Sequence, residues 1–180
     1  MEYELIIVRY GEIGLKAKET RKRFENTLVN NIKNALNTKQ LACRIKKERG
    51  RIYVHTNKIG ESISILQKVF GIVSVSPTIH THSDIDSMSE LSVRISKEAL
   101  RREKSFALRV TRTGEHNYTS QDVAVRIGND IVKAIQANVN LTEPDFELFI
   151  EIRNKSAYIF TEKIRGAGGL PLGTQGKALA

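Results

Sequence analysis

The sequence contains a single cysteine, Cys43, and no long apolar run. One cysteine cannot form an internal disulfide, and it excludes a cysteine-rich metal site. No apolar stretch approaches the ~20 residues that a membrane-spanning helix needs. The opening MEYELIIVRYGE has no basic segment and only a short apolar core, so we expect no signal peptide. These absences predict a cytoplasmic protein without a membrane partner.

Acidic residues are too few to balance the basic ones. Asp and Glu total 20 against 29 Lys and Arg, which gives a net charge of +9. Such an excess favours polyanionic partners, above all nucleic acid. Basic residues crowd a predicted helix start, from Lys16 through Arg21 to Arg23, where cations oppose the helix dipole and an external anion is favoured. A second basic stretch, residues 44–51, fits a solvated surface equally well.

The first block of the chain alternates strands and helices. Residues 3–10 are apolar on both faces, as in a central strand, and residues 42–56 form a predicted hairpin. Residues 73–82 form a further strand, in which Pro77 belongs on an edge or at a bulge. Two helical stripes separate these strands, carried by Phe24, Leu28, Ile32 and Leu36, and by Ile63, Leu66 and Phe70. The order β-α-β-β-α-β is the ferredoxin-like pattern.

The second block is also mixed. A capped helix begins near Ser87, a strand runs through SFALRVTR, and a helix follows from Ser120. A hairpin then turns at Asn154 and Lys155. The Gly-rich end, residues 166–180, has no structural period and predicts a linker or tail. The predicted fold class is therefore α+β (α/β), with a ferredoxin-like domain followed by a second α/β domain.

The stretch RVTRTGEHNYTSQD, residues 109–122, is the strongest candidate site. It predicts a strand end, a loop that turns at Gly114, and a helix whose first turn is capped by Thr119 and Asp122. Backbone N–H groups at a helix start bind anions. We expect five side chains to converge there and to hold phosphate: Arg109, Arg112, His116, Asn117 and Tyr118.

Catalytic and metal-binding interpretations find little support. GEIGLK lacks the spacing of a phosphate-binding P-loop, and GAGG is not a dinucleotide-binding motif. His80, His82 and Asp84 share a strand face but are weak evidence for a metal. His116 fits phosphate or ribose contact better than a role as general base. We therefore predict no catalytic residues and no metal site in this chain.

Three motifs carry a resemblance to a known family. RVTRTGEHNYTSQDVAVRIG resembles the signature of the THUMP domain, an RNA-binding module of tRNA-modifying enzymes. RYGEIGLK near the start and TEKIRGAGGLPLGTQGKALA at the end resemble the tRNA 4-thiouridine synthetase (tRNA sulfurtransferase, thiamine-biosynthesis ThiI) family. The resemblance implies a ferredoxin-like domain over 1–76, a THUMP domain over 77–168, and a linker over 169–180.

The chain departs from the family pattern at its end. In the family an ATP-binding PP-loop domain with the motif SGGxDS follows the GTQG linker, and this motif is not found here. Cys43 does not match the family's sulfur-relaying cysteine, which belongs to that domain. We therefore expect no cofactor in this chain, and ATP only in a PP-loop domain. That domain either follows in a longer protein or belongs to a separate chain.

The resemblance implies a function in substrate capture. The two domains would hold the acceptor arm and 3′-CCA end of tRNA for uridine thiolation. The sequence leaves open whether the chain forms a homodimer. Alternatives are a THUMP adaptor for methylation, deamination or acetylation of tRNA, a basic structural RNA-binding protein, and an enzyme complete in itself. The predicted RNA-binding residues are Lys16, Arg21, Arg109, Arg112, His116, Tyr118 and Arg165. Tyr118 or His116 would stack on a base, whereas Arg165 either touches RNA or lies in a flexible link.

Overall fold

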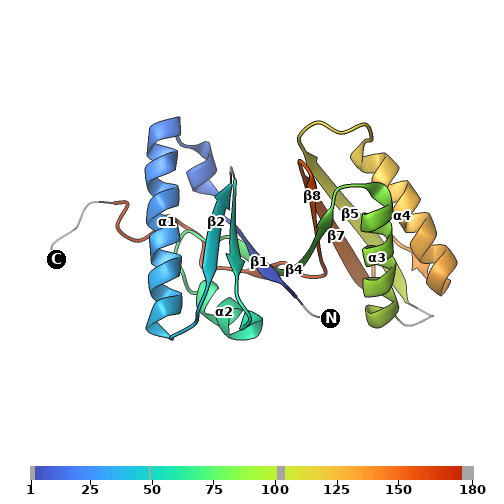
Figure 1. The fold of residues 1–180 in the computed structure, drawn as a ribbon, viewed down its shortest axis with the longest axis horizontal. Helices are drawn as coiled ribbons and strands as arrows, with labels where there is room; N and C mark the ends of the chain where they lie inside the picture. Colours follow the sequence, from blue (N-terminus) through green and yellow to red (C-terminus); the bar gives the residue numbers. More distant parts are fainter. Residues whose placement is uncertain (1–2, 49, 101–103, 176–180) are drawn as a thin grey trace. The chain divides into compact units, whose positions relative to one another are not determined.

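The computed structural model describes residues 3–48, 50–100 and 104–175. The chain divides into two compact units, shown in Figure 1. The first unit combines residues 3–77 with residues 163–175, and the second unit consists of residues 78–162. No helix in the described parts of the chain has the length and apolar character that crossing a membrane requires.

The first unit has the predicted β-α-β-β-α-β order. Its strands pair in the order β2-β3-β1-β4, and β9 pairs with the first residues of β4. The elements are β1 (Leu5–Arg9), the 3-10 helix η1 (Glu12–Leu15), α1 (Lys18–Thr38), β2 (Arg44–Glu48), β3 (Arg51–His55), α2 (Ile59–Leu66), β4 (Ser74–His82) and β9 (Ile164–Arg165). The ferredoxin-like prediction is confirmed.

The core of the first unit lies between α1 and its sheet. Phe24 and Leu28 on α1 are buried in one cluster with Ile6 and Val8 of β1. Burying a side chain of this size contributes about 1.5–3 kcal/mol, so the four-residue stripe of α1 sets how the helix docks. The stripe predicted for α2 is wrong at its end. The helix stops at Leu66, and Phe70, four residues later, is exposed.

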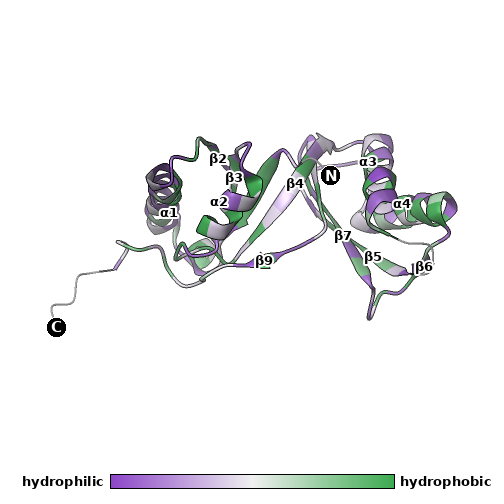
Figure 2. Ribbon diagram, turned by 90° about the horizontal axis from the view of Figure 1, so that it is seen from below, coloured by the Kyte–Doolittle hydropathy of each residue, from purple (hydrophilic) through white to green (hydrophobic). Residues whose placement is uncertain are grey.

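The second unit is a mixed sheet with two helices. The end of β4 pairs with β8, β8 with β7, and β7 with β5, which also pairs briefly with β6. Helices α3 and α4 lie over one face of β5 and β7 (Figure 2). The elements are α3 (Ile85–Ala99), β5 (Ser105–Thr113), α4 (Ser120–Ile135), β6 (Asn138–Val139), β7 (Phe146–Arg153) and β8 (Ser156–Phe160). The parallel pairing of β5 with β7 brings the loops after these two strands to one edge.

Strand β4 contains the proline that sequence analysis placed at an edge or bulge. Pro77 lies between the residues of β4 paired with β9, at Ser74 and Val75, and those paired with β8, from Ile79 onward. Proline has no N–H to donate to a ladder, so the point where β4 changes partner tolerates it.

The Gly-rich end of the chain does more than link. Residues 163–175 pack with the first unit, although part of this stretch was expected to be a linker. The N–H of Gly168 donates to the carbonyl of Ile72 at 2.7 Å, and Leu170 packs against the core of the first unit. Residues 176–180 of the predicted linker lie outside the described residues. The domain boundaries expected after residues 76 and 168 stay predictions.

Candidate nucleic-acid interface

The loop between β5 and α4 turns at Gly114, as the sequence predicted. Its φ is +105°, a conformation that side-chain-bearing residues rarely adopt. A Cβ at this position would lie 2.7 Å from Oδ1 of Asn154 and 3.3 Å from the N atom of Asn154. Glycine therefore serves two needs here, the turn itself and the close approach of the β7–β8 turn.

Helix α4 begins with the predicted capping box. Oγ1 of Thr119 accepts from the N–H of Asp122 at 3.1 Å, and Oδ2 of Asp122 accepts from the N–H of Thr119 at 2.8 Å. These hydrogen bonds hold the pKa of Asp122 below its ordinary value. Because the cap already engages a backbone N–H group at the start of α4, an anion at this position would meet mainly the side chains of the preceding loop.

Both ring nitrogens of His116 have hydrogen-bond partners. Nε2 lies 2.7 Å from the carbonyl oxygen of Asn154, which can only accept, so Nε2 carries the hydrogen. Nδ1 then accepts from Nη1 of Arg112 at 3.3 Å, and the same guanidinium donates to the carbonyl of Gly114 at 3.2 Å. Both ring nitrogens are engaged, so His116 positions the loop and is a poor candidate for a free base.

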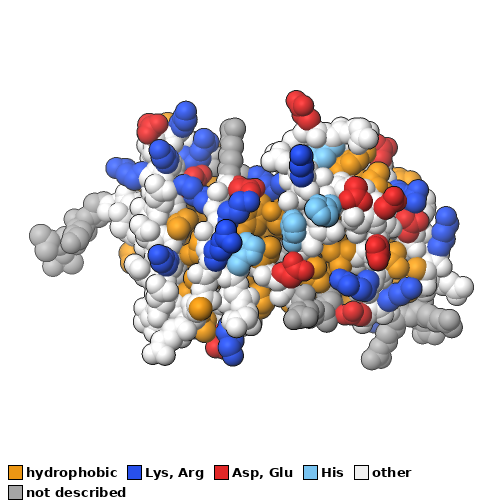
Figure 3. Space-filling model, in the orientation of Figure 1, with side chains coloured by type: hydrophobic (Ala, Val, Ile, Leu, Met, Phe, Trp, Pro, Cys, Tyr) orange, Lys and Arg blue, Asp and Glu red, His pale blue; other side chains and the backbone are white. Residues whose placement is uncertain are grey.

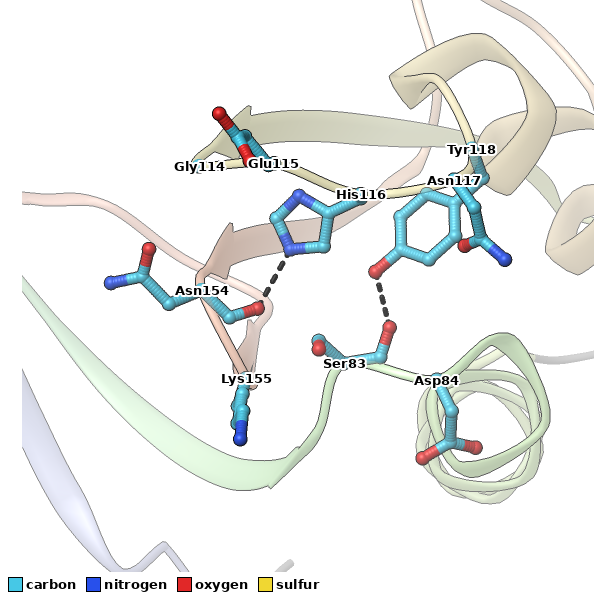
Figure 4. Close-up of a pocket in the computed structure, with 9 residues that line it drawn as sticks. All are labelled: Ser83, Asp84, Gly114, Glu115, His116, Asn117, Tyr118, Asn154 and Lys155. Carbon is cyan, nitrogen blue, oxygen red and sulfur yellow. Dashed lines mark hydrogen bonds between the residues drawn. The ribbon is translucent and has the colours of Figure 1, made fainter.

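Tyr118 lies beside His116 and ties the loop to the start of α3. The two ring centroids are 5.1 Å apart, with an angle of 33° between the ring planes. The Tyr118 hydroxyl donates to the carbonyl of Ser83, as drawn in Figure 4. Burial raises the pKa of this hydroxyl, which therefore stays protonated and keeps its hydrogen bond to Ser83.

These side chains surround a hollow of about 710 Å³ in the second unit. Three segments line it: residues 83–84, residues 114–118 and residues 154–155 (Figure 4). Lys155 is exposed, and no ion pair of its side chain occurs among the residues that the structure describes. Asp84 adds a carboxylate, whose Oδ1 caps α3 by accepting from the N–H of Ser87 at 2.8 Å. The hollow thus offers aromatic faces, amide groups and an available cation.

Sequence analysis missed Asn154 and Lys155 as site residues and described them only as a turn. The one feature of the sequence that could have indicated a role in binding is the cation Lys155 within a two-residue hairpin turn. Its link to the candidate loop depends on the parallel pairing of β5 with β7, in which Thr113 lies opposite Arg153.

Arg109 does not join this cluster, so the predicted convergence is wrong for this residue. Side chains alternate between the two faces of a strand, so Arg109 and Arg112, which are three residues apart in β5, point to opposite faces. Nε of Arg109 pairs with Oε1 of Glu147 at 2.9 Å, and Nη2 donates to the carbonyl of Leu141 at 2.7 Å. Arg109 lines a second, largely apolar groove of about 640 Å³ between β5 and α4. Its contact with RNA stays a prediction.

The first unit has its own cationic surface at the start of α1. The N-cap residue, Ala17, provides no side-chain cap, and exposed Lys16 comes directly before it. Arg21 lies in the first turn, with Nε 4.0 Å from Oε1 of Glu25. Figure 3 shows Lys and Arg side chains gathered at this end of α1. An uncapped helix start beside cations suits an anionic ligand, and binding of RNA by Lys16 and Arg21 stays a prediction.

The buried carboxylate of Glu25 lies beneath this cationic surface and pairs with its side chains. It is 7% exposed and accepts from the Tyr10 hydroxyl at 2.6 Å, while Nζ of Lys47 lies 3.5 Å from its Oε2. Burial, followed by the hydrogen bond to Glu25, raises the pKa of Tyr10 far above its ordinary value. The buried carboxylate is thus paired and holds Lys47 and Arg21 near the helix start.

Arg165 lies in β9, where its carbonyl accepts from Nε2 of Gln67 at 3.2 Å. Its side chain is exposed.

Among the described residues no group of three His, Cys, Asp or Glu side chains is placed to hold a metal ion. Nε2 of His80 instead lies 3.0 Å from the Ser156 hydroxyl, and burial raises the pKa of Cys43, which disfavours its reactive thiolate.

Comparisons with known proteins agree with this architecture. Residues 5–76 match the ThiI ferredoxin-like domain family, and residues 82–162 match the THUMP domain family. The chain is 39% identical to the probable tRNA sulfurtransferase of Methanobrevibacter smithii, over 99% of this chain and 47% of that protein. It is 40% identical to the corresponding protein of Methanothermobacter thermautotrophicus, over 100% of this chain and 46% of that protein. The chain therefore spans about half the length of these relatives.

Solved structures give the same result. A protein of Pyrococcus horikoshii matches with a TM-score of 0.86 at 38% identity, over 95% of this chain and 58% of that one. A 4-thiouridine synthetase, crystallised with RNA and bound ATP, matches with a TM-score of 0.77 at 30% identity, over 96% of this chain and 44% of that one. The resemblance predicted from the sequence is confirmed. The chain carries a ThiI ferredoxin-like domain and a THUMP domain, and over nearly its whole length it is similar to about half of proteins named tRNA sulfurtransferase.

Proposed function

We propose that this chain captures the acceptor arm and 3′-CCA end of tRNA for uridine thiolation, the reaction that makes 4-thiouridine. The observation that carries the proposal is the hollow of the THUMP unit, where Lys155, His116 and Tyr118 come together. The similarity to a 4-thiouridine synthetase in complex with RNA, and to relatives named tRNA sulfurtransferase, supports it. The net charge of +9 agrees with a polyanionic partner.

The hollow suits an unpaired nucleotide better than a duplex. Single-stranded RNA is recognised by stacking of splayed bases on aromatic side chains and by cations on the backbone. The Tyr118 and His116 rings supply the stacking surface, and Lys155 supplies the phosphate contact. Asp84 disfavours a phosphate at its own side of the hollow, which orients the backbone toward Lys155.

The start of α1 supplies a second, separate contact in this proposal. Lys16 and Arg21 would bind phosphates of the acceptor arm, where backbone contacts position the RNA without reading its sequence. Arg109 and Arg165 are the weaker members of the predicted set. The guanidinium of Arg109 is already paired with Glu147, and Arg165 projects from β9 of the ferredoxin-like unit.

The chemistry of thiolation belongs to another domain in this proposal. The relatives are about twice as long as this chain, and a PP-loop domain, in the same or a separate chain, would bind ATP and activate the uridine. This chain would contribute no cofactor and would work in the cytoplasm, where tRNA is modified.

The test is a binding comparison with the 180-residue chain. Fluorescence anisotropy measures the affinity for a full tRNA and for the same tRNA without its CCA end. Losing one stacked base costs about 1–3 kcal/mol, or about 5- to 150-fold in affinity. Equal affinity for the two RNAs would refute capture of the CCA end, and no binding to either would refute the function as a whole.

A variant pair locates the contact. Lys155→Ala removes the available cation of the hollow, and Lys97→Ala removes an exposed cation of α3, also in the THUMP unit. Lys155→Ala should weaken tRNA binding and lower the slope of log affinity against log salt by roughly 0.7, the value for one single-strand phosphate. Lys97→Ala should leave both unchanged. The same loss in both variants would mean that overall charge, and not the hollow, binds the RNA.

A further inference from the structure

Residues 163–175, here called the latch, follow the THUMP unit in sequence but pack on the ferredoxin-like unit. Ile164 and Arg165 pair with Val75 and Ser74 as a two-residue antiparallel strand. The latch and the segment after α2 then exchange backbone hydrogen bonds. The N–H groups of Gly166 and Gly168 donate to the carbonyls of Val73 and Ile72 at 2.9 and 2.7 Å, and the N–H of Gly71 donates to the carbonyl of Gly168 at 2.7 Å.

Two glycines permit this close approach. A Cβ on Gly166 would lie 2.4 Å from the carbonyl oxygen of Ile72, a backbone atom that cannot rotate away. Gly71 has a φ of +98°, and its Cβ would lie 2.9 Å from Cγ of Pro171. The backbones on both sides of this contact therefore require glycine, which a flexible linker would not.

Side chains from both helices of the ferredoxin-like unit hold the latch along its length. Nδ2 of Asn31 on α1 donates to the carbonyl of Leu172 at 3.0 Å. Nε2 of Gln67, the C-cap residue of α2, donates to the carbonyl of Arg165 at 3.2 Å. Between these two points Pro171 is buried and Leu170 packs against the core. The contacts with the ferredoxin-like unit thus run from β9 to Leu172. Beyond them, the hydroxyl of Thr174 donates to the carbonyl of Pro171 at 2.7 Å, which closes a turn within the latch itself.

We propose that the latch is an integral part of the ferredoxin-like unit and fixes the place from which the chain leaves it. The match to the ThiI ferredoxin-like domain family ends at residue 76, so the assignment of residues 163–175 to this unit comes from their contacts. The THUMP unit, residues 78–162, is then an insertion that begins within β4, after Pro77, and ends just before β9. A segment that continues past the latch is anchored to the ferredoxin-like unit. This inference does not depend on RNA binding.

Hydrogen exchange of the 180-residue chain, followed by mass spectrometry, tests the latch. The amides of Gly71, Gly166 and Gly168 should exchange at least about 100-fold more slowly than in an unstructured peptide. A linker without stable contacts would exchange at nearly the unprotected rate. Unprotected exchange across residues 164–172 in the wild-type chain would overturn the proposal.

A glycine pair isolates the close contact. Gly166→Ala should release the latch and raise its exchange rate by about tenfold or more, with faster tryptic cleavage after Arg165. Gly60→Ala, in α2 of the same unit, adds a methyl group where nothing lies within 4 Å and should leave exchange unchanged. Equal exchange in Gly166→Ala and wild type would overturn the proposal. If Gly166→Ala fails to fold, protection in the wild-type chain still decides the question.

Discussion

Replacing Gly114 with alanine measures how tightly the candidate loop is held. The residue has a φ of +105°, and forcing a side-chain-bearing residue into such a conformation costs about 1–3 kcal/mol. The new Cβ would also lie 2.7 Å from Oδ1 of Asn154, which can rotate away, and 3.3 Å from its backbone N, which cannot. We expect a loss of about 2–3 kcal/mol in the free energy of unfolding, with backbone strain as the larger part.

Urea unfolding of the 180-residue chain, followed by circular dichroism, gives this free energy. Gly128→Ala is the matched control, because Gly128 lies in α4 of the same unit with nothing within 4 Å of its Cβ position. There alanine should stabilise the chain by about 0.5–1 kcal/mol, since it is the better helix former. The two substitutions add the same methyl group and should change stability in opposite directions. If Gly114→Ala is as stable as wild type, the account of the loop is wrong.

Two further predictions concern the same loop. Tyr118→Phe removes the hydroxyl that donates to Ser83 and should lower the free energy of unfolding by about 0.5–1.5 kcal/mol, while the ring that would stack on RNA remains. Equal stability of variant and wild type in urea would show that this hydrogen bond contributes nothing. The pKa of Asp122 is lowered in the folded state, so its contribution to stability is present above its ordinary pKa of 3.8 and is lost as the pH falls through the folded value. Asp122→Asn should therefore be less stable than wild type at neutral pH, and the difference should shrink below about pH 4 in acid unfolding curves. A difference that is independent of pH would contradict this assignment.

The arrangement around His116 explains why the loop is better suited to holding a ligand than to catalysis. Its imidazole is locked between the Asn154 carbonyl and the Arg112 guanidinium, so it has no free nitrogen for proton transfer. A rigid ring next to Tyr118 instead presents a preformed surface for a base. Preorganisation of this kind reduces the entropy lost on binding.

Local features of this protein followed from the sequence alone. The stripe of Phe24, Leu28 and their neighbours identified the buried face of α1, because residues four apart share one side of a helix. The cap of Thr119 and Asp122 and the turn at Gly114 were also predictable. In each case the interacting groups lie within a few residues of one another, so spacing and residue type are sufficient. The ferredoxin-like order and the family resemblance followed for the same reason, since both are recorded in the succession of local patterns.

The make-up of the site depended on tertiary structure. His116 and Asn154 are 38 residues apart, and the parallel pairing of β5 with β7 brings them together. That pairing places Lys155 at the hollow, whereas the pleat of β5 turns Arg109 toward Glu147. The latch likewise joins Gly166 to Ile72 across the whole THUMP unit, in a stretch that has no local period. These contacts join residues that are far apart in the sequence, where folding brings together backbones that hydrogen-bond and apolar faces that pack. The spacing of residues along the chain does not specify which distant segments will meet.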